Sequence, residues 1–274
     1  MSLELLTVIK DGARLAASRN GVLFMVLFAL FQGFTMLLVL SAGSVYIPVS
    51  PSMTGVEAAP PPGDELPEII AALATTLTNL ISGLLLVPVY IVAIRSFVGK
   101  KRSHIPDDYI FRRIGRATIS AYLAGFLMLF IVVCVFVAPF VPLYWMVGTV
   151  DGLMLLGVVL IAVLLSVILT AFVWICFLFI NHTIAVEDAG PISALRMSWS
   201  LTQGHRVRLF ILAFFLAVVQ SVITSPTALL PDPLGFFVML PLTSLLTILS
   251  LAIFARAYVA IHPEKGAIRQ RLST

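Results

Sequence analysis

The sequence predicts an all-α, polytopic integral membrane protein with six transmembrane helices and additional cytoplasmic amphipathic helices. Three observations support this fold class. First, 60% of the 274 residues are hydrophobic and only 11% are charged, with a mean hydropathy of +1.10, whereas a soluble domain has about 25% charged residues. Second, six long stretches contain no Asp, Glu, Lys or Arg. Third, every Lys and Arg lies on one side of the topology that these stretches define.

The charge-free stretches mark the spans, because a charged side chain at the bilayer centre costs roughly 2.5–3.5 kcal/mol on insertion scales. Each stretch can hold a helix of the ~20 apolar residues needed to cross the hydrocarbon core. The predicted spans are residues 21–42, 70–97, 119–139, 153–181, 209–224 and 236–258. They form a single membrane domain over residues 1–274.

Two of these ranges need comment. The fourth is too long for a helix perpendicular to the membrane, so it must tilt or project beyond the bilayer. The fifth is the weakest, because Ser225 and Pro226 end its apolar run early, and its helix could begin before Leu209. The runs are continuous rather than alternating, which argues against a β-barrel.

The distribution of basic residues predicts the orientation. The side that holds both termini carries all 17 Lys and Arg residues, of which Arg95 and Arg256 lie at span ends and are expected to snorkel to the surface. By the positive-inside rule, both termini are cytoplasmic. The basic composition is therefore a topology signal, and we expect no nucleic-acid partner. The opposite loops hold only acidic charges, at Glu57, Asp64, Glu65, Glu68, Asp151 and Asp232.

A mixed apolar and basic stretch precedes each pair of spans, at residues 3–19, 109–116 and 191–203. We expect these to be helices in the inner headgroup region, with ordinary connecting loops as the alternative. In the third, Pro191 suits the first helical turn and Gly204 the position after the helix end. The repeated unit suggests a three-hairpin repeat. The residues expected on the apolar faces are Leu5, Leu6, Ile9, Ala13 and Ala16 in the first stretch and Ile192, Leu195 and Trp199 in the third.

Polar residues inside the spans are the first candidate site. Gln32, Asn79 and Gln220 form a possible intramembrane cluster that could line a substrate cavity. They could equally join helices, since interhelical hydrogen bonds contribute about 0.6–2 kcal/mol each. No Asp, Glu, Lys, Arg or His lies at mid-membrane in the predicted spans, which argues against an ion-coupled transporter or a pump.

No catalytic, cofactor-binding or metal-binding motif is present in the sequence. The nearest candidate is His104 with Asp107 and Asp108. Because Pro106 precedes the two aspartates, we interpret this group as a helix start with a solvated charge cluster. We therefore expect a protein that is not an enzyme and needs no cofactor.

Several segments resemble known membrane proteins. The run Ala-Leu-Arg-x-Ser-Trp-x-Leu-Thr-x-Gly at residues 194–204, followed by Arg-Leu-Phe at 208–210, resembles the membrane domain attached to some glycerophosphodiester phosphodiesterases. With residues 90–95 and 105–109, the chain resembles an uncharacterised archaeal, haloarchaeal-type family of six-helix membrane proteins. The resemblance implies an archaeal plasma membrane. It does not imply hydrolysis, because the chain contains no soluble barrel of ~250 residues.

These observations predict a non-enzymatic membrane module that interacts with lipids or a partner protein in the plasma membrane. The alternatives are a small-molecule or lipid permease without ion coupling, and a membrane-embedded enzyme of lipid metabolism. The expected partners are lipids of an anionic inner leaflet and a membrane protein or a second copy of the chain. The candidate inner-leaflet contacts are Lys100, Lys101, Arg102, Arg112, Arg113, Arg116, Arg196, Trp199, Arg206 and Arg208.

Overall fold

The computed structural model describes residues 4–46, 85–142, 152–229 and 234–262, with Thr76 and Gly83 as isolated positions. The regular structure in these residues is entirely helical, as the sequence predicts, and they contain no strand. A further apolar helix spans Leu85–Val98. The labelled elements are α1 (Leu5–Ala16), α2 (Arg19–Tyr46), α4 (Asp107–Phe111), α5 (Ile114–Val137), η1 (Ala138–Phe140), α7 (Gly152–Cys176), α8 (Ile180–Glu187), α9 (Pro191–Thr202), α10 (Arg206–Thr224), η2 (Ser225–Leu229) and α11 (Leu234–Ile261).

Five of the predicted spans correspond to helices that are long and apolar enough to cross a membrane. These are α2, α5, α7, α10 and α11, and they indicate a membrane-embedded protein. Only Leu85–Val98 of the second span is described as a continuous helix, and it is shorter than the ~20 residues that a crossing needs. The count of six spans is therefore not confirmed. Asn79, within that span, lies outside the described residues.

The observed helix ends refine two predicted ranges. α10 begins at Arg206, three residues before the charge-free run that starts at Leu209. α7 ends at Cys176, and a turn at residues 177–179 separates it from α8. The long fourth span is thus divided between two helices.

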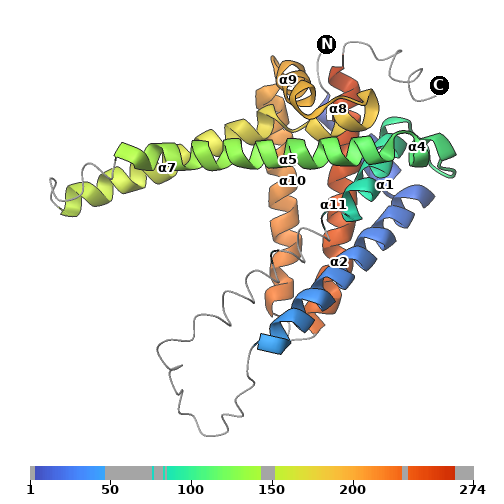
Figure 1. The fold of residues 1–274 in the computed structure, drawn as a ribbon, viewed down its shortest axis with the longest axis horizontal. Helices are drawn as coiled ribbons and strands as arrows, with labels where there is room; N and C mark the ends of the chain where they lie inside the picture. Colours follow the sequence, from blue (N-terminus) through green and yellow to red (C-terminus); the bar gives the residue numbers. More distant parts are fainter. Residues whose placement is uncertain are drawn as a thin grey trace, which may run out of the picture.

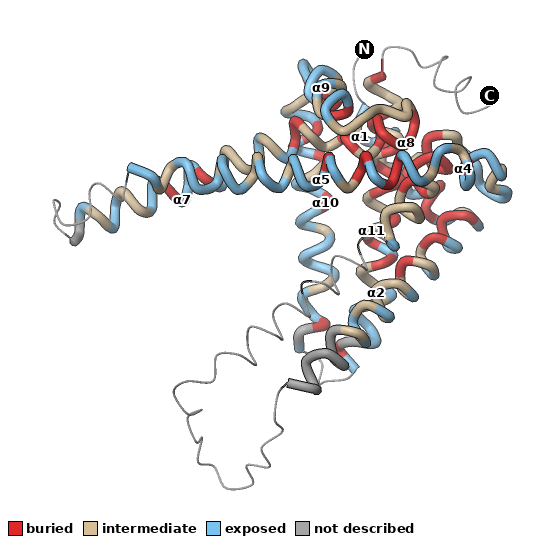
Figure 2. The backbone as a smooth tube through the Cα atoms, in the orientation of Figure 1, coloured by how far each residue is buried: buried red, intermediate tan, exposed pale blue. Residues whose placement is uncertain are grey.

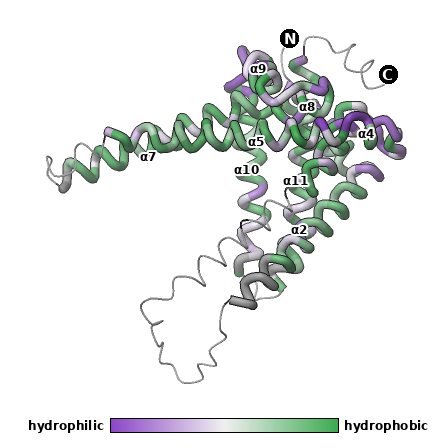
Figure 3. Tube along the Cα trace, viewed as in Figure 1, coloured by the Kyte–Doolittle hydropathy of each residue, from purple (hydrophilic) through white to green (hydrophobic). Residues whose placement is uncertain are grey.

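The long helices form two sets (Figure 1). α5 and α7 pack side by side as a hairpin that projects to one side, whereas α10 and α11 run across this hairpin and α2 runs obliquely to both. Buried residues concentrate where the two sets meet, around α1, α4 and α8, and exposed residues line the hairpin (Figure 2). The hairpin is hydrophobic along its length, and the polar residues gather near α4 and α9 (Figure 3). Exposed apolar helices of this kind are suited to contact lipid chains.

α1 packs against α11 rather than lying free at a surface. A side chain at Gly12 would meet the Cα and Cγ1 atoms of Ile253 at 2.6 Å, so the two helices approach each other closely at this point. Arg256 of α11 adds an ion pair with Asp11, at 3.8 Å. The predicted helix is present. Leu6 and Ala13, on its predicted apolar face, are exposed, and the residues buried against the protein are Val8, Gly12, Leu15 and Ala16.

The face that α9 presents to the protein consists of small residues. The helix begins at Pro191, and Gly204 follows its end with φ +78°, both as predicted. Ile192 and Trp199, on the predicted apolar face, are exposed, whereas Ala194, Ser198 and Thr202 are buried. The burial of the two hydroxyl side chains has a physical reason. The Ser198 and Thr202 hydroxyls donate hydrogen bonds to the Cys176 carbonyl, at 3.1 and 3.3 Å, at the end of α7, where no intrahelical partner exists.

The middle stretch is not a single amphipathic helix. α4 ends at Phe111, and α5 begins at Ile114 after a turn in which Arg113 has a left-handed backbone, with φ 43°. The predicted range 109–116 is therefore divided between the end of a short helix and the start of a long one.

Substitution of Gly12 by Leu is expected to displace α1 from α11. The added side chain has no space beside Ile253, and overpacking typically costs about 1–3 kcal/mol. Thermal unfolding of the detergent-solubilised protein, followed by circular dichroism, measures the effect as a lower midpoint. Ala13→Leu, at an exposed position on the same helix, is the matched control. Equal midpoints for the two variants would contradict the packing described above.

Candidate functional site

A buried arginine organises the region where the two sets of helices meet. Arg95 is only 2% exposed. Its Nε donates a hydrogen bond to the Ala185 carbonyl at 2.7 Å, in the last turn of α8. Its Nη1 donates to the carbonyls of Tyr109 and Arg112, at 3.1 and 2.8 Å, at the end of α4. Because the last carbonyls of a helix have no partner within it, Arg95 caps two helix ends at once.

Asp188 completes this cluster. Its backbone is left-handed, with φ 51°, and it directly follows α8. Its carboxylate lies 3.4 Å from Nη2 of Arg95 and 3.6 Å from Nε of Arg112. Burial also raises the pKa of the neighbouring Tyr109 phenol. The expectation that Arg95 snorkels to the membrane surface is wrong, because protein carbonyls and Asp188 bind its guanidinium.

A second polar cluster joins α8 to the end of α11. The Tyr258 hydroxyl donates to Oε1 of Glu187 at 2.8 Å, and Nε2 of His262 lies 2.9 Å from the same oxygen. His182 stacks on the Tyr258 ring, with centroids 5.6 Å apart. All of these side chains are nearly inaccessible, so the cluster stabilises the helix junction and offers little surface to a substrate.

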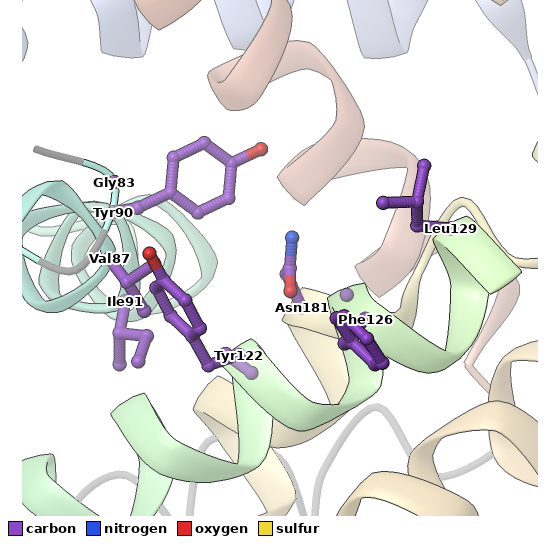
Figure 4. Close-up of a pocket in the computed structure, with 10 residues that line it drawn as sticks. Gly83, Val87, Tyr90, Ile91, Tyr122, Phe126, Leu129 and Asn181 are labelled. Atoms are coloured by element: carbon purple, nitrogen blue, oxygen red, sulfur yellow. The ribbon is translucent and has the colours of Figure 1, made fainter. Parts of the chain in front are cut away.

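An apolar cavity of about 400 Å³ lies beside this junction in the described part of the chain. It lies between the Leu85–Val98 helix, α5 and the start of α8 (Figure 4). Phe126 and Leu129 on its α5 wall are 71% and 58% exposed, so the cavity opens toward the outside of the protein along this helix. The lining residues are Gly83, Val87, Tyr90, Ile91, Ala121, Tyr122, Gly125, Phe126, Leu129 and Asn181.

Three polar groups converge on this apolar space. Tyr90, Tyr122 and Asn181 each come from a different helix, and Figure 4 shows their side chains around the same cavity. Among the residues that the structure describes, the Tyr90 hydroxyl and the Asn181 amide form no hydrogen bond. Pockets of about 300–1,000 Å³ with apolar walls and a few polar groups are typical ligand sites. The cavity is therefore the best candidate site.

The predicted intramembrane polar cluster is not assembled in the described part of the chain. Oε1 of Gln32 accepts hydrogen bonds from the hydroxyls of Thr243 and Ser244, both at 3.1 Å, and so joins α2 to α11. Gln220 is exposed on α10. Packing therefore explains Gln32. A pathway role for Gln32, Asn79 and Gln220 stays a prediction.

The predicted inner-leaflet contacts are mostly exposed. Arg206 is an exception, because its guanidinium lies 4.4 Å from the Trp199 ring and 5.1 Å from the Phe172 ring. Such cation–π contacts stabilise the junction of α7, α9 and α10. Arg112 is half-buried and pairs with Asp188. The exposed members are Lys100, Lys101, Arg102, Arg113, Arg116, Arg196, Trp199 and Arg208.

The group around His104 forms no enclosed site. Asp107 and Asp108 lie exposed in the first turn of α4, which begins directly after Pro106 as predicted. No cluster of three His, Cys, Asp or Glu residues within the described ranges could hold a metal ion. The cavity residues Tyr90, Tyr122 and Asn181 were not among the predicted sites. The three come from separate segments, so spacing along the chain gives no signal for their convergence.

Comparison with known proteins gives a family but no activity. A family model described as a domain of unknown function, DUF7847, matches residues 3–261. No curated protein and no solved structure matches the chain.

Replacement of Arg95 by Met is expected to destabilise the protein strongly. It leaves three helix-end carbonyls without their donor and Asp188 with Arg112 as its remaining ion-pair partner, and breaking a buried ion pair costs about 3–5 kcal/mol. Arg95→Lys should recover only part of the loss, because one ammonium cannot reproduce the planar fork of donors. Urea unfolding in detergent, with Arg196→Met as an exposed control, measures both effects. Full stability of the Lys variant would show that charge alone is required.

Proposed function

The chain belongs to the DUF7847 family, a domain of unknown function, and from its structure we propose that it is a non-enzymatic membrane module that binds a lipid in the cavity between the Leu85–Val98 helix, α5 and α8. The observation that carries this proposal is the cavity itself. Its walls are apolar apart from Tyr90, Tyr122 and Asn181, and two exposed residues of α5 form its outer wall. A lipid chain can therefore enter from the side without crossing a polar barrier.

The size of the cavity and its position support the same proposal. A volume of about 400 Å³ is enough for part of a chain rather than a whole two-chain lipid. The cavity adjoins a hairpin whose exposed surface is hydrophobic (Figures 2 and 3). We propose that this hairpin lies among lipid chains in the plasma membrane, so that the ligand reaches the cavity from the bilayer.

The proposal includes the orientation, with both termini in the cytoplasm. Hydrophilic residues gather near α4 and α9 (Figure 3), and the basic residues Arg112, Arg113, Arg196 and Arg206 lie in or next to these two helices. Contact of these residues with anionic headgroups would contribute about 1 kcal/mol each. The basic surface would hold the protein at the inner leaflet.

The resemblance to membrane domains attached to glycerophosphodiester phosphodiesterases favours an association with lipid metabolism.

Gly125→Leu is expected to close the cavity and abolish lipid retention. Gly125 lines the cavity, and no atom lies within 4 Å of a Cβ placed there, so the new side chain can extend into the space without a clash. Native mass spectrometry of protein released from nanodiscs should show a bound lipid on the wild type and at least a tenfold lower occupancy on the variant.

Gly157→Leu is the matched control for this experiment. Gly157 is also exposed and also has open space at its Cβ, but it lies on α7 and does not line the cavity. This variant should retain the lipid at the wild-type level. Equal lipid retention by all three proteins would contradict the proposed site.

The orientation has a separate test. Reporter fusions at Lys101 and Gly204 should report a cytoplasmic location, and fusions at Gly55, Gly148 and Asp232 an external one, because all Lys and Arg residues lie on the side of the first two. A cytoplasmic signal at Gly55 would overturn the proposed topology.

A further inference from the structure

The lining of the cavity restricts the chemistry of its ligand. We propose that the cavity binds an uncharged lipid that carries a hydroxyl group, such as a diacylglycerol or a polyprenol, and does not bind a phospholipid. This inference rests on the proposed lipid-binding function and names the class of ligand.

The first argument is the absence of charge among the described residues that line the cavity. Of these ten, two are tyrosines and one is an asparagine, and the other seven are Gly, Ala, Val, Ile, Leu or Phe. An ionised group moved into such surroundings without a partner loses several kcal/mol of solvation free energy. A phosphate group is therefore unfavourable inside the cavity, so a ligand whose polar end is held there is uncharged.

The second argument is that the nearby basic residues Arg95 and Arg116 are not placed to neutralise a phosphate in the cavity. Arg95, on the same helix as Tyr90, has its guanidinium bound to three carbonyls and Asp188. Arg116 lies on α5 about 9 Å along the helix axis from Tyr122, at 1.5 Å per residue. Helical side chains lean toward the N-terminus, so the side chain of Arg116 is directed away from Tyr122.

The third argument is the match of donors and acceptors. The amide of Asn181 offers both a donor and an acceptor, and a phenol such as Tyr90 can donate and accept. A ligand hydroxyl can donate to the Asn181 oxygen and accept from Tyr90, whereas a carbonyl can only accept. The Asn181 oxygen would then remain without a donor inside an apolar cavity, which is unfavourable.

Tyr122 contributes a second phenol at a defined place. Its oxygen lies 3.0 Å from the position of a Cβ added to Gly83, so the absence of a side chain at Gly83 lets Tyr122 extend across the cavity. Tyr90, in turn, packs against Phe28 of α2, with ring centroids 6.2 Å apart. The polar end of the ligand is therefore expected between these two rings and Asn181, with its chain along Phe126 and Leu129.

Photolabelling tests the inference directly. Three diazirine-labelled probes are used in nanodiscs: a diacylglycerol, a polyprenol and a phosphatidylglycerol. Labelled peptides are then mapped by mass spectrometry. We expect at least one of the two hydroxyl lipids to label residues 83–91 and 121–129 at least tenfold more than phosphatidylglycerol does. The relative labelling by the two neutral probes identifies the source of the hydroxyl.

Variants of the polar groups test the specific contacts. Asn181→Leu and Tyr90→Phe should each reduce labelling by the neutral probe at least fivefold. Gln220→Leu, which changes an exposed amide on α10, should leave labelling unchanged. Monodisperse gel filtration of each variant ensures that folded protein is compared. Unchanged labelling in both Asn181→Leu and Tyr90→Phe would overturn the inference.

The remaining outcomes separate the inference from the proposed function. If phosphatidylglycerol labels the cavity as strongly as the neutral probes, and Gly125→Leu abolishes this labelling, the site binds lipid but the inference is wrong. If no probe labels the cavity, or if Gly125→Leu leaves labelling unchanged, the proposed function fails, and the inference fails with it.

Discussion

The structure depends on the pairing of helix-end carbonyls by side chains from other helices. In an apolar environment no water is available to satisfy the last carbonyls of a helix, so each buried helix end requires a donor from the protein. Arg95 provides donors for the ends of α4 and α8. Ser198 and Thr202 provide them for the end of α7. These contacts explain why the most buried polar side chains gather where the helices meet.

The same constraint explains which features were predictable from the sequence. The ranges of the long helices follow from the free-energy cost of placing a charged residue in the bilayer. This cost belongs to each residue separately, so it can be summed along the chain. The role of Arg95 follows from partners that lie between 14 and 93 residues away. A positional pattern cannot reveal such partners. Arg95 was therefore predicted as a surface-seeking residue, although it is among the most buried in the described part of the protein.

The protein-facing sides of α1 and α9 could not be predicted from the sequence for a related reason. In a soluble protein, hydrophobic periodicity marks the face that packs on the core. α9 instead buries Ser198 against the end of α7 and leaves Trp199 exposed. In α1, the close approach to Ile253 selects Gly12, which a hydrophobicity pattern does not favour. In a membrane-embedded protein, exposed apolar residues can contact lipid, whereas buried helix ends need polar partners. The usual pattern of buried apolar and exposed polar residues is therefore partly reversed in these helices.

The capping of helix ends also defines the candidate site. Arg95 lies a little more than one helical turn after Tyr90, and Ala185 lies about one turn after Asn181. The hydrogen bond between Arg95 and Ala185 therefore fixes the position of one cavity wall relative to another. Among the described residues, Tyr90 and Asn181 have no hydrogen-bond partner, and the charged cluster nearby holds the helices that carry them. The shape of the cavity, and with it the proposed preference for an uncharged ligand, therefore depends on Arg95 remaining bound to the carbonyl of Ala185.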